Sequence, residues 1–219
     1  MKNNSITLPR HLGPRCRPVS SVVLAIVALS WNSCSRPPSG DYFPMAEGAE
    51  WEYLAEVASP AASGAKQVQT GKEIVRCDGK EIINGREYWK CAVMMVGFPE
   101  QADGVFYLRK SGEGVYSIEG GKQNPERLYL ALPAVVGKNW GSSGGKNSFT
   151  NWIEAIETAD VYRRKYADCV KLRYQIKDQA EKVTSDVTIH SAPGIGPVKA
   201  TFRFGEVWLK LSLEKYSLK

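Results

Sequence analysis

The cysteines of the chain carry the most reactive chemistry, and two of them flank a turn. Cys77 and Cys91 lie on either side of "INGR", a segment typical of a β-hairpin. We expect a three-residue loop of Ile83, Asn84 and Gly85, with Gly85 in a left-handed bulge, which sets Cys77 opposite Cys91. A two-residue Asn-Gly turn would shift that pairing by one residue.

Two cysteines placed opposite each other form a disulfide in an oxidising compartment. We therefore predict a bridge between Cys77 and Cys91. The alternative is a pair of small apolar residues on one strand face. In either case Cys169 is left without a partner.

Cys169 and His190 are the one nucleophile and base pair that the sequence offers. Both fall on polar faces of neighbouring expected strands. Nothing in the pattern orients His190 toward the thiol, so we favour a partly exposed thiol and a surface histidine. We expect no catalytic residue and no enzymatic activity.

Motifs for metals and cofactors are missing from the sequence. A zinc site needs three or four converging His, Cys or carboxylate ligands, and no such spacing occurs. "GEG" and "SSGG" stand between expected strands with no helix after them, which argues against a phosphate site. We expect no metal and no cofactor.

The charge of the chain is concentrated at its start. The formal net charge is +6, and Lys2, Arg10, Arg15 and Arg17 lie in a first segment without Asp or Glu. The body after Cys34 therefore has a net charge of only +2. This weak charge, with no dense Lys/Arg cluster, argues against nucleic acid as a partner.

Residues 1–33 have the pattern of a signal peptide. Basic residues are followed by the apolar run "VVLAIVALSW", Val22 to Trp31, and then by small residues around Cys34. Ten apolar residues are too few for a membrane-spanning helix, which needs about 20. The sequence thus predicts export, and a transmembrane anchor or a buried core helix is the weaker reading.

Two cleavage sites compete at the end of this segment. "ALS", Ala28 to Ser30, would release a soluble secreted or periplasmic protein that begins at Trp31. "WNSC" resembles a bacterial lipobox, in which Cys34 is lipidated, although Trp31 and Asn32 depart from the usual pattern. We favour lipidation, because residues 34–41 form a polar tether of the kind that an anchored domain needs.

Residues 42–219 have the alternation of an all-β domain. In "CVKLRYQIK", Cys169 to Lys177, every second residue is apolar, as in a strand with one buried face. Similar runs are separated by Gly, Asn, Asp and Pro. We expect a single antiparallel meander of about ten or eleven strands, forming a curved sheet or open half-barrel. Asn151 to Asp168 could be helical, and we interpret it as strand, turn, strand.

One motif occurs twice, 89 residues apart. "FPMAEGAEW", Phe43 to Trp51, returns as "LPAVVGKNW", Leu132 to Trp140, with Pro, Gly and Trp at the same spacing. We interpret each copy as a corner in which Gly takes an unusual backbone angle and Trp opens a strand. The corners divide the domain into two halves, about 42–131 and 132–219.

Several phrases together carry a family resemblance: "YFPMAEGAEWEY", "INGREYW", "LPAVVGKNW", "YADCVKLRY" and "APGIGPVKATF". They resemble uncharacterised exported bacterial proteins, often lipoproteins, whose body is one curved antiparallel sheet. Those proteins are distantly similar in fold to lipoprotein carrier proteins. The resemblance implies a place in the bacterial cell envelope and, for 192–199, a Gly/Pro corner. It implies no catalytic residue.

Two hypotheses for the function follow from these patterns. The first is a non-catalytic binding module for a lipid, an acyl chain or another apolar ligand, anchored to a membrane through Cys34. The second is a structural or protein-interaction component of the envelope. A candidate apolar ligand face is formed by four residues whose parity differs from the main core positions of their strands: Tyr88, Met94, Trp208 and Tyr216.

Overall fold

The structure is a computed structural model that describes residues 40–60, 66–98, 103–144 and 147–218. The expected signal peptide, Cys34 and all of the tether before Gly40 lie outside the described residues. The described residues all belong to one compact unit.

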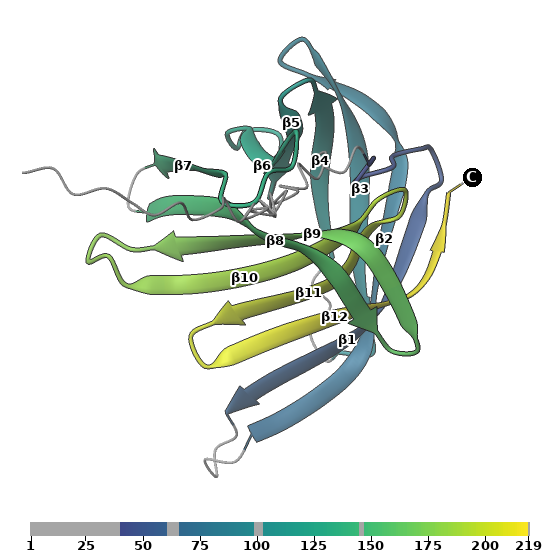
Figure 1. Ribbon diagram of the computed structural model, residues 1–219, viewed down its shortest axis with the longest axis vertical. Helices are drawn as coiled ribbons and strands as arrows, with labels where there is room; N and C mark the ends of the chain where they lie inside the picture. The colour runs from purple at the N-terminus through teal and green to yellow at the C-terminus, as the bar shows by residue number, and fades with distance from the viewer. Residues whose placement is uncertain (1–39, 61–65, 99–102, 145–146, 219) are drawn as a thin grey trace, which may run out of the picture. The chain divides into compact units, whose positions relative to one another are not determined.

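Twelve strands form a single sheet (Figure 1). The first six are β1 (Glu50–Pro60), β2 (Lys66–Ile83), β3 (Arg86–Val96), β4 (Gly104–Ser111), β5 (Gly114–Glu119) and β6 (Arg127–Ala131). The second six are β7 (Asn139–Gly144), β8 (Asn147–Val161), β9 (Arg164–Lys177), β10 (Val183–Ala192), β11 (Gly196–Phe204) and β12 (Val207–Ser217).

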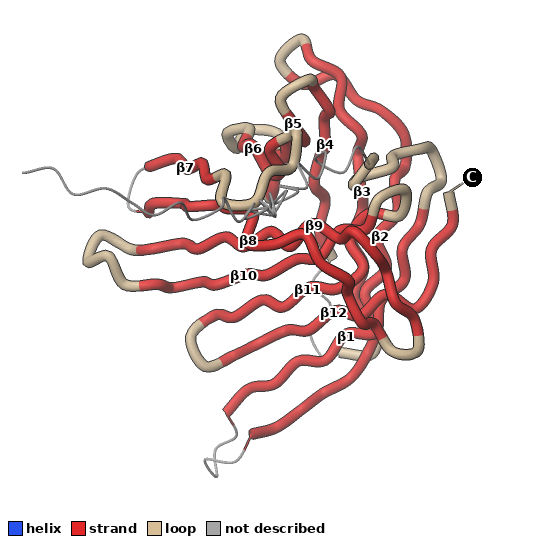
Figure 2. Tube along the Cα trace, viewed as in Figure 1, coloured by secondary structure: helices blue, strands red, loops and turns tan. Residues whose placement is uncertain are grey.

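Every pair of neighbouring strands is antiparallel, and the order is β6-β5-β4-β3-β2-β1-β12-β11-β10-β9-β8-β7. The first and last strands pair in the middle, and β6 and β7 are the two edges. Figure 2 shows strands and loops throughout the described part, which contains no helix long and apolar enough to cross a membrane. The expected all-β, open and curved sheet is confirmed, with twelve strands in place of ten or eleven.

Asn151 to Asp168 is strand, turn and strand, as expected. β8 and β9 pair up to Val161 and Arg164, and Tyr162 and Arg163 form the two-residue turn between them. Tyr162 has a φ of 53°, an angle that two-residue hairpin turns require at their first position. Cross-strand pairing thus decides the conformation of a segment whose residue pattern also fits a helix.

The two copies of the repeated motif make the same backbone hydrogen bonds. Gly48 N–H donates to Cys77 O over 2.8 Å, and Gly137 N–H donates to Ile153 O over 2.9 Å. Gly48 and Gly137 have φ angles of 75° and 85°, in the region where a side chain is disfavoured. Each corner therefore has the same hydrogen-bonded turn at its glycine.

The tryptophan at the first corner fixes a contact far along the chain. Trp51 is 4% exposed, and its indole N–H donates to the carbonyl oxygen of Ile195 over 2.6 Å. Gly196 has a φ of 96°, and a Cβ placed on it would lie 3.4 Å from the Trp51 nitrogen. The side chain of Trp51, near the start of β1, therefore packs against the Gly/Pro corner between β10 and β11.

Candidate functional site: an apolar cavity

A cavity of about 370 Å³ lies on the inner face of the curved sheet. Its walls come from both ends of the sheet, because Ser117 of β5 and Ile189 of β10 line the same space. The curvature therefore produces a site that a flat sheet would not have. The aromatic residues that line it are Phe43, Trp51, Tyr53, Phe106, Tyr129, Tyr174 and Phe202.

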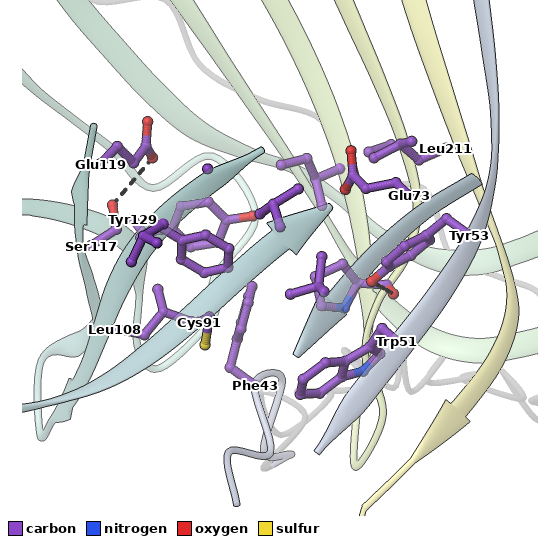
Figure 3. A pocket seen from close by; sticks show the side chains of 18 of the residues that line it. Phe43, Trp51, Tyr53, Glu73, Cys91, Leu108, Ser117, Glu119, Tyr129 and Leu211 are labelled. Atoms are coloured by element: carbon purple, nitrogen blue, oxygen red, sulfur yellow. Dashed lines mark hydrogen bonds between the residues drawn. The ribbon is translucent and has the colours of Figure 1, made fainter. Parts of the chain in front are cut away.

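The segment before β1 closes part of this cavity. Figure 3 shows Phe43 reaching from that segment into the space near Trp51 and Cys91. Its ring meets Tyr129 edge to face, with centroids 5.1 Å apart. The segment is held by Asp41, whose carboxylate pairs with Lys110 at 2.6 Å and whose carbonyl accepts a hydrogen bond from Gly194 N–H.

Two polar side chains in the wall have hydrogen-bond partners. The Tyr53 hydroxyl donates to the carbonyl oxygen of Pro197 over 2.9 Å, and Ser117 donates to Glu119 over 3.4 Å (Figure 3). Burial raises the pKa values of Tyr53 and Tyr129 well above 10, so both stay neutral. The cavity is therefore mainly apolar, as in most sites for small apolar ligands.

Glu73 differs from Glu119, the other carboxyl group in this wall. Its half-buried side chain lines the cavity, and no hydrogen bond or ion pair joins it to another side chain in the described residues. Burial raises the pKa of its carboxyl from 4.5 to about 7. Glu73 is therefore a carboxyl group whose charge can change near neutral pH.

A second cavity, of about 170 Å³, adjoins the first where the two edges of the sheet meet. The two cavities share Ser117, Glu119, Tyr129 and Tyr174. The indole N–H of Trp140 on β7 donates to the carbonyl oxygen of Leu128 on β6 over 2.7 Å. Side-chain contacts rather than strand pairing therefore join the edges.

Comparison with solved structures shows which known fold this sheet resembles. An exported protein with a YmcC-like fold, as it is described, from Bacteroides fragilis matches with a TM-score of 0.51. The match covers 82% of this chain and 100% of that chain, at 14% identity. This chain has a YmcC-like fold. The resemblance that the sequence predicted is confirmed at the level of the fold.

Two further structures match over a similar part of the chain. A protein described as a lipoprotein from Parabacteroides distasonis has a TM-score of 0.39 at 13% identity, and covers 81% of this chain and 99% of its own. A LolA superfamily protein from Nitrosomonas europaea has a TM-score of 0.35 at 10% identity, with 81% and 88% covered. No family model and no curated protein matches the chain.

Cys77 and Cys91 are direct partners in the YmcC-like sheet, and the expected turn is wrong. Ile83 pairs with Arg86, so Asn84 and Gly85 form a two-residue turn with φ angles of 51° and 76°. A bulge between Cys77 and Gly79 then shifts the register back by one residue. The sulfur atoms of the two buried cysteines lie 2.6 Å apart, and the bridge itself stays a prediction.

Counting thiols tests that bridge. In the exported protein, denatured without a reducing agent, we expect one reactive thiol, that of Cys169, because the register places Cys77 against Cys91. After reduction the body should show three. Three reactive thiols before reduction would reject the bridge. In that case Cys77→Ser should lower the count before reduction from three to two, whereas with a bridge it should raise the count from one to two.

None of the four residues of the candidate ligand face lines the cavity. Alternation along β3 places Tyr88 and Met94 on the face opposite to Cys91, and Trp208 lies opposite to Leu211 on β12. Tyr216 pairs with Trp51, because the register shifts between Leu213 and Lys215. Their role in ligand binding stays a prediction.

Tyr88 is covered by its own neighbours on the outer face. It is 3% exposed and packs with Ile83, Tyr107 and Ile118. Its hydroxyl donates to Glu126 over 2.6 Å, and Arg109 binds the same carboxylate oxygen at 2.8 Å. Tyr88 therefore belongs to a small packed cluster, whereas Met94 is 46% exposed.

The expected exposure of Cys169 is also wrong. Cys169 is fully buried, and its thiol donates to the carbonyl oxygen of Tyr166 over 3.2 Å. The cause is a break in the alternation of β9, where Asp168 has a φ of 53° and the pairing with β8 shifts. Burial raises the pKa of the Cys169 thiol, which disfavours the nucleophilic thiolate.

His190 lies on the outer face, as its parity predicted. Its Nε2 atom is 2.9 Å from the Glu157 carboxylate, and this contact lowers the pKa of Glu157. In the described residues no group of three or more His, Cys, Asp and Glu side chains is arranged to hold a metal ion.

The sequence reasoning missed Glu73 as a site residue. The signal was present, because Glu73 alternates with Val75 and Cys77, and all three line the cavity. A carboxylate at an inward position of a strand is uncommon unless it has a partner or a function. The aromatic wall formed by Tyr129 and Tyr174 was harder to predict from the sequence, because these residues meet only when the sheet is curved.

Proposed function

We propose that this protein is an exported, membrane-anchored lipoprotein that acts as a non-catalytic binding module for an apolar ligand or lipid. The apolar cavity carries the proposal: it is formed by both halves of the sheet and is large enough for a small ligand or part of an acyl chain. A half-barrel that served only as a scaffold would fill this space with its own side chains.

The anchor completes the proposal. The signal-peptide pattern and Cys34 support export and lipidation, and the Bacteroides fragilis protein with a similar fold is described as exported. Six residues separate Cys34 from Asp41, the first of the described residues with a side-chain ion pair. At about 3.3–3.6 Å per residue, this tether keeps Asp41 within roughly 25 Å of a lipidated Cys34.

A matched pair of substitutions on β2 tests the binding site. Val75 lines the cavity, whereas its neighbour Ile74 points to the other face, and both are half-buried. We expect Val75→Phe to weaken binding of dodecanol, measured by calorimetry, at least about tenfold, because the ring takes up ligand volume. Ile74→Phe should leave binding unchanged.

Equal affinities of the two variants would reject the cavity as the site. Circular dichroism and the thermal midpoint of each variant are measured first. Both variants must keep the wild-type spectrum, which the open space beside Val75 makes the expected result.

The alternative function, a protein-interaction component of the envelope, has one supporting observation. Met94 and Val96 lie on the same face of β3, outside the cavity, and are 46% and 42% exposed. Exposed apolar residues that gather on one surface are typical of interaction sites.

A further inference from the structure

The cavity contains one acidic group without a partner, and this suggests what kind of ligand it takes. We propose that the cavity binds an amphiphile with a positively charged amine head and an aliphatic chain, and that Glu73 holds the amine. This inference rests on the proposed function, since it names the ligand class of the same site.

The charges around the cavity favour a cation. No Lys, Arg or His is among the described residues that line it, and its two ionisable carboxyl groups are Glu73 and Glu119. The remaining titratable residues in the wall, tyrosines and cysteines, cannot carry a positive charge: Tyr53, Tyr129, Tyr174, Cys77 and Cys91.

Two cations beside this region are already engaged. Lys110 pairs with Asp41 of the segment before β1. Arg127 lines the second cavity, where its guanidinium lies 3.7 Å above the Phe149 ring. Neither contributes to the pKa of Glu73, which is raised by burial.

The two residues that pair with Glu73 across the strands offer it no free proton donor. Its cross-strand partners are Tyr53 on β1 and Met95 on β3, and the Tyr53 hydroxyl already donates to Pro197. Figure 3 shows the Glu73 carboxyl between Tyr53 and Leu211 at the cavity wall. A ligand in the cavity can therefore donate a hydrogen bond to this carboxyl group.

Each type of head group would meet Glu73 differently. An ammonium head forms a charge-assisted hydrogen bond with the ionised carboxylate, which is strengthened by the apolar surroundings. A fatty-acid carboxylate would place a second negative charge beside the first, which is unfavourable. An alcohol forms only a neutral hydrogen bond and should bind with intermediate affinity.

The titration of Glu73 predicts how amine binding depends on pH. Its pKa of about 7 is above the ordinary 4.5, so the carboxyl of the ligand-free protein is ionised mainly above pH 7. The ionised fraction rises about tenfold between pH 6 and pH 8, whereas an alkylamine stays protonated over this range. We therefore expect dodecylamine to bind about tenfold more tightly at pH 8 than at pH 6.

The experiment compares dodecylamine, dodecanol and dodecanoate by calorimetry at pH 6 and pH 8. It uses the full exported chain with Cys34→Ser, which removes the predicted lipid and allows purification without detergent. At pH 8 the amine should bind at least about tenfold more tightly than the alcohol, and the dodecanoate most weakly. Glu73→Gln should remove both the amine preference and its pH dependence, whereas Glu206→Gln, an exposed change outside the cavity, should keep them.

The outcomes separate the two proposals. Dodecanoate binding as tightly as the amine at pH 8, or an amine preference that survives in Glu73→Gln, would overturn the inference about Glu73. Tight dodecanol binding with no amine preference would also overturn it and would leave the proposed function in place. If none of the three probes binds, both proposals fail.

Discussion

Replacing Trp51 with Ala should lower the free energy of unfolding by about 3–5 kcal/mol, the largest stability effect that we expect from one substitution. The Trp51 ring is buried at the centre of the sheet, and its indole N–H bonds to Ile195. The truncation removes this packing and leaves the Ile195 carbonyl without its partner. Urea unfolding, with the midpoint and slope both fitted, measures the change.

The repeated motif supplies an internal control for this prediction. Trp140 occupies the equivalent place at the second corner and also donates to a backbone carbonyl, that of Leu128. Trp140 is only half-buried and lies at the edge of the sheet, so Trp140→Ala should cost less, about 1–2 kcal/mol. Equal losses at the two corners would contradict the view that β1 is the centre of the structure.

Replacing Cys34 with Ser should release the protein from membranes. We propose that Cys34 carries the acyl chains that hold the body at the surface, and serine cannot be lipidated at this position. In fractionated cells the wild-type protein should sediment with membranes, and more than about nine-tenths of the variant should stay in the soluble fraction. The change is close to all-or-none, because stable attachment needs the lipid.

The competing cleavage site gives this test its control. If the leader is cut after Ser30, wild-type protein and Cys34→Ser will both be soluble, and mass spectrometry will find Trp31 at the N-terminus. If the serine variant stays in the membrane fraction at the wild-type level, the lipoprotein proposal is rejected. Cys16→Ser, a change in the part that is removed, should behave as the wild type does.

The architecture could be predicted because its signals are local. Alternation in "CVKLRYQIK" and the hairpin at Asn84 and Gly85 are properties of a few adjacent residues. A meander of hairpins then fixes most of the strand order, since sequential strands usually pair. The pairing of β1 with β12 was harder to predict from the sequence, because it joins residues at opposite ends of the domain.

Errors in the sequence reasoning occur where strands contain bulges. The extra residue near Asp78 restores the pairing of Cys77 with Cys91 that the two-residue turn would have broken. The bulge near Asp168 turns Cys169 into the core. A strict alternation of faces cannot predict such breaks, since a bulge has only a weak signal in a single sequence.

The cavity depends on the curvature of the whole sheet. For this reason the sequence pattern predicted a candidate ligand face outside the cavity. Parity alone identifies two faces but does not say which of them becomes concave. Residues such as Tyr129 and Ile189 meet only when the sheet bends. A search for inward carboxylates would have found Glu73 from the sequence.

Native mass spectrometry tests the central claim, a bound apolar ligand, most directly. The exported chain with Cys34→Ser is purified without detergent, and the mass of the intact protein is compared with the mass after denaturation. We predict a co-purifying molecule of lipid or amphiphile size, and less of it in Val75→Phe, in which the added ring takes up part of the cavity. A folded wild-type protein with no bound mass would contradict the binding proposal and favour an anchored interaction domain.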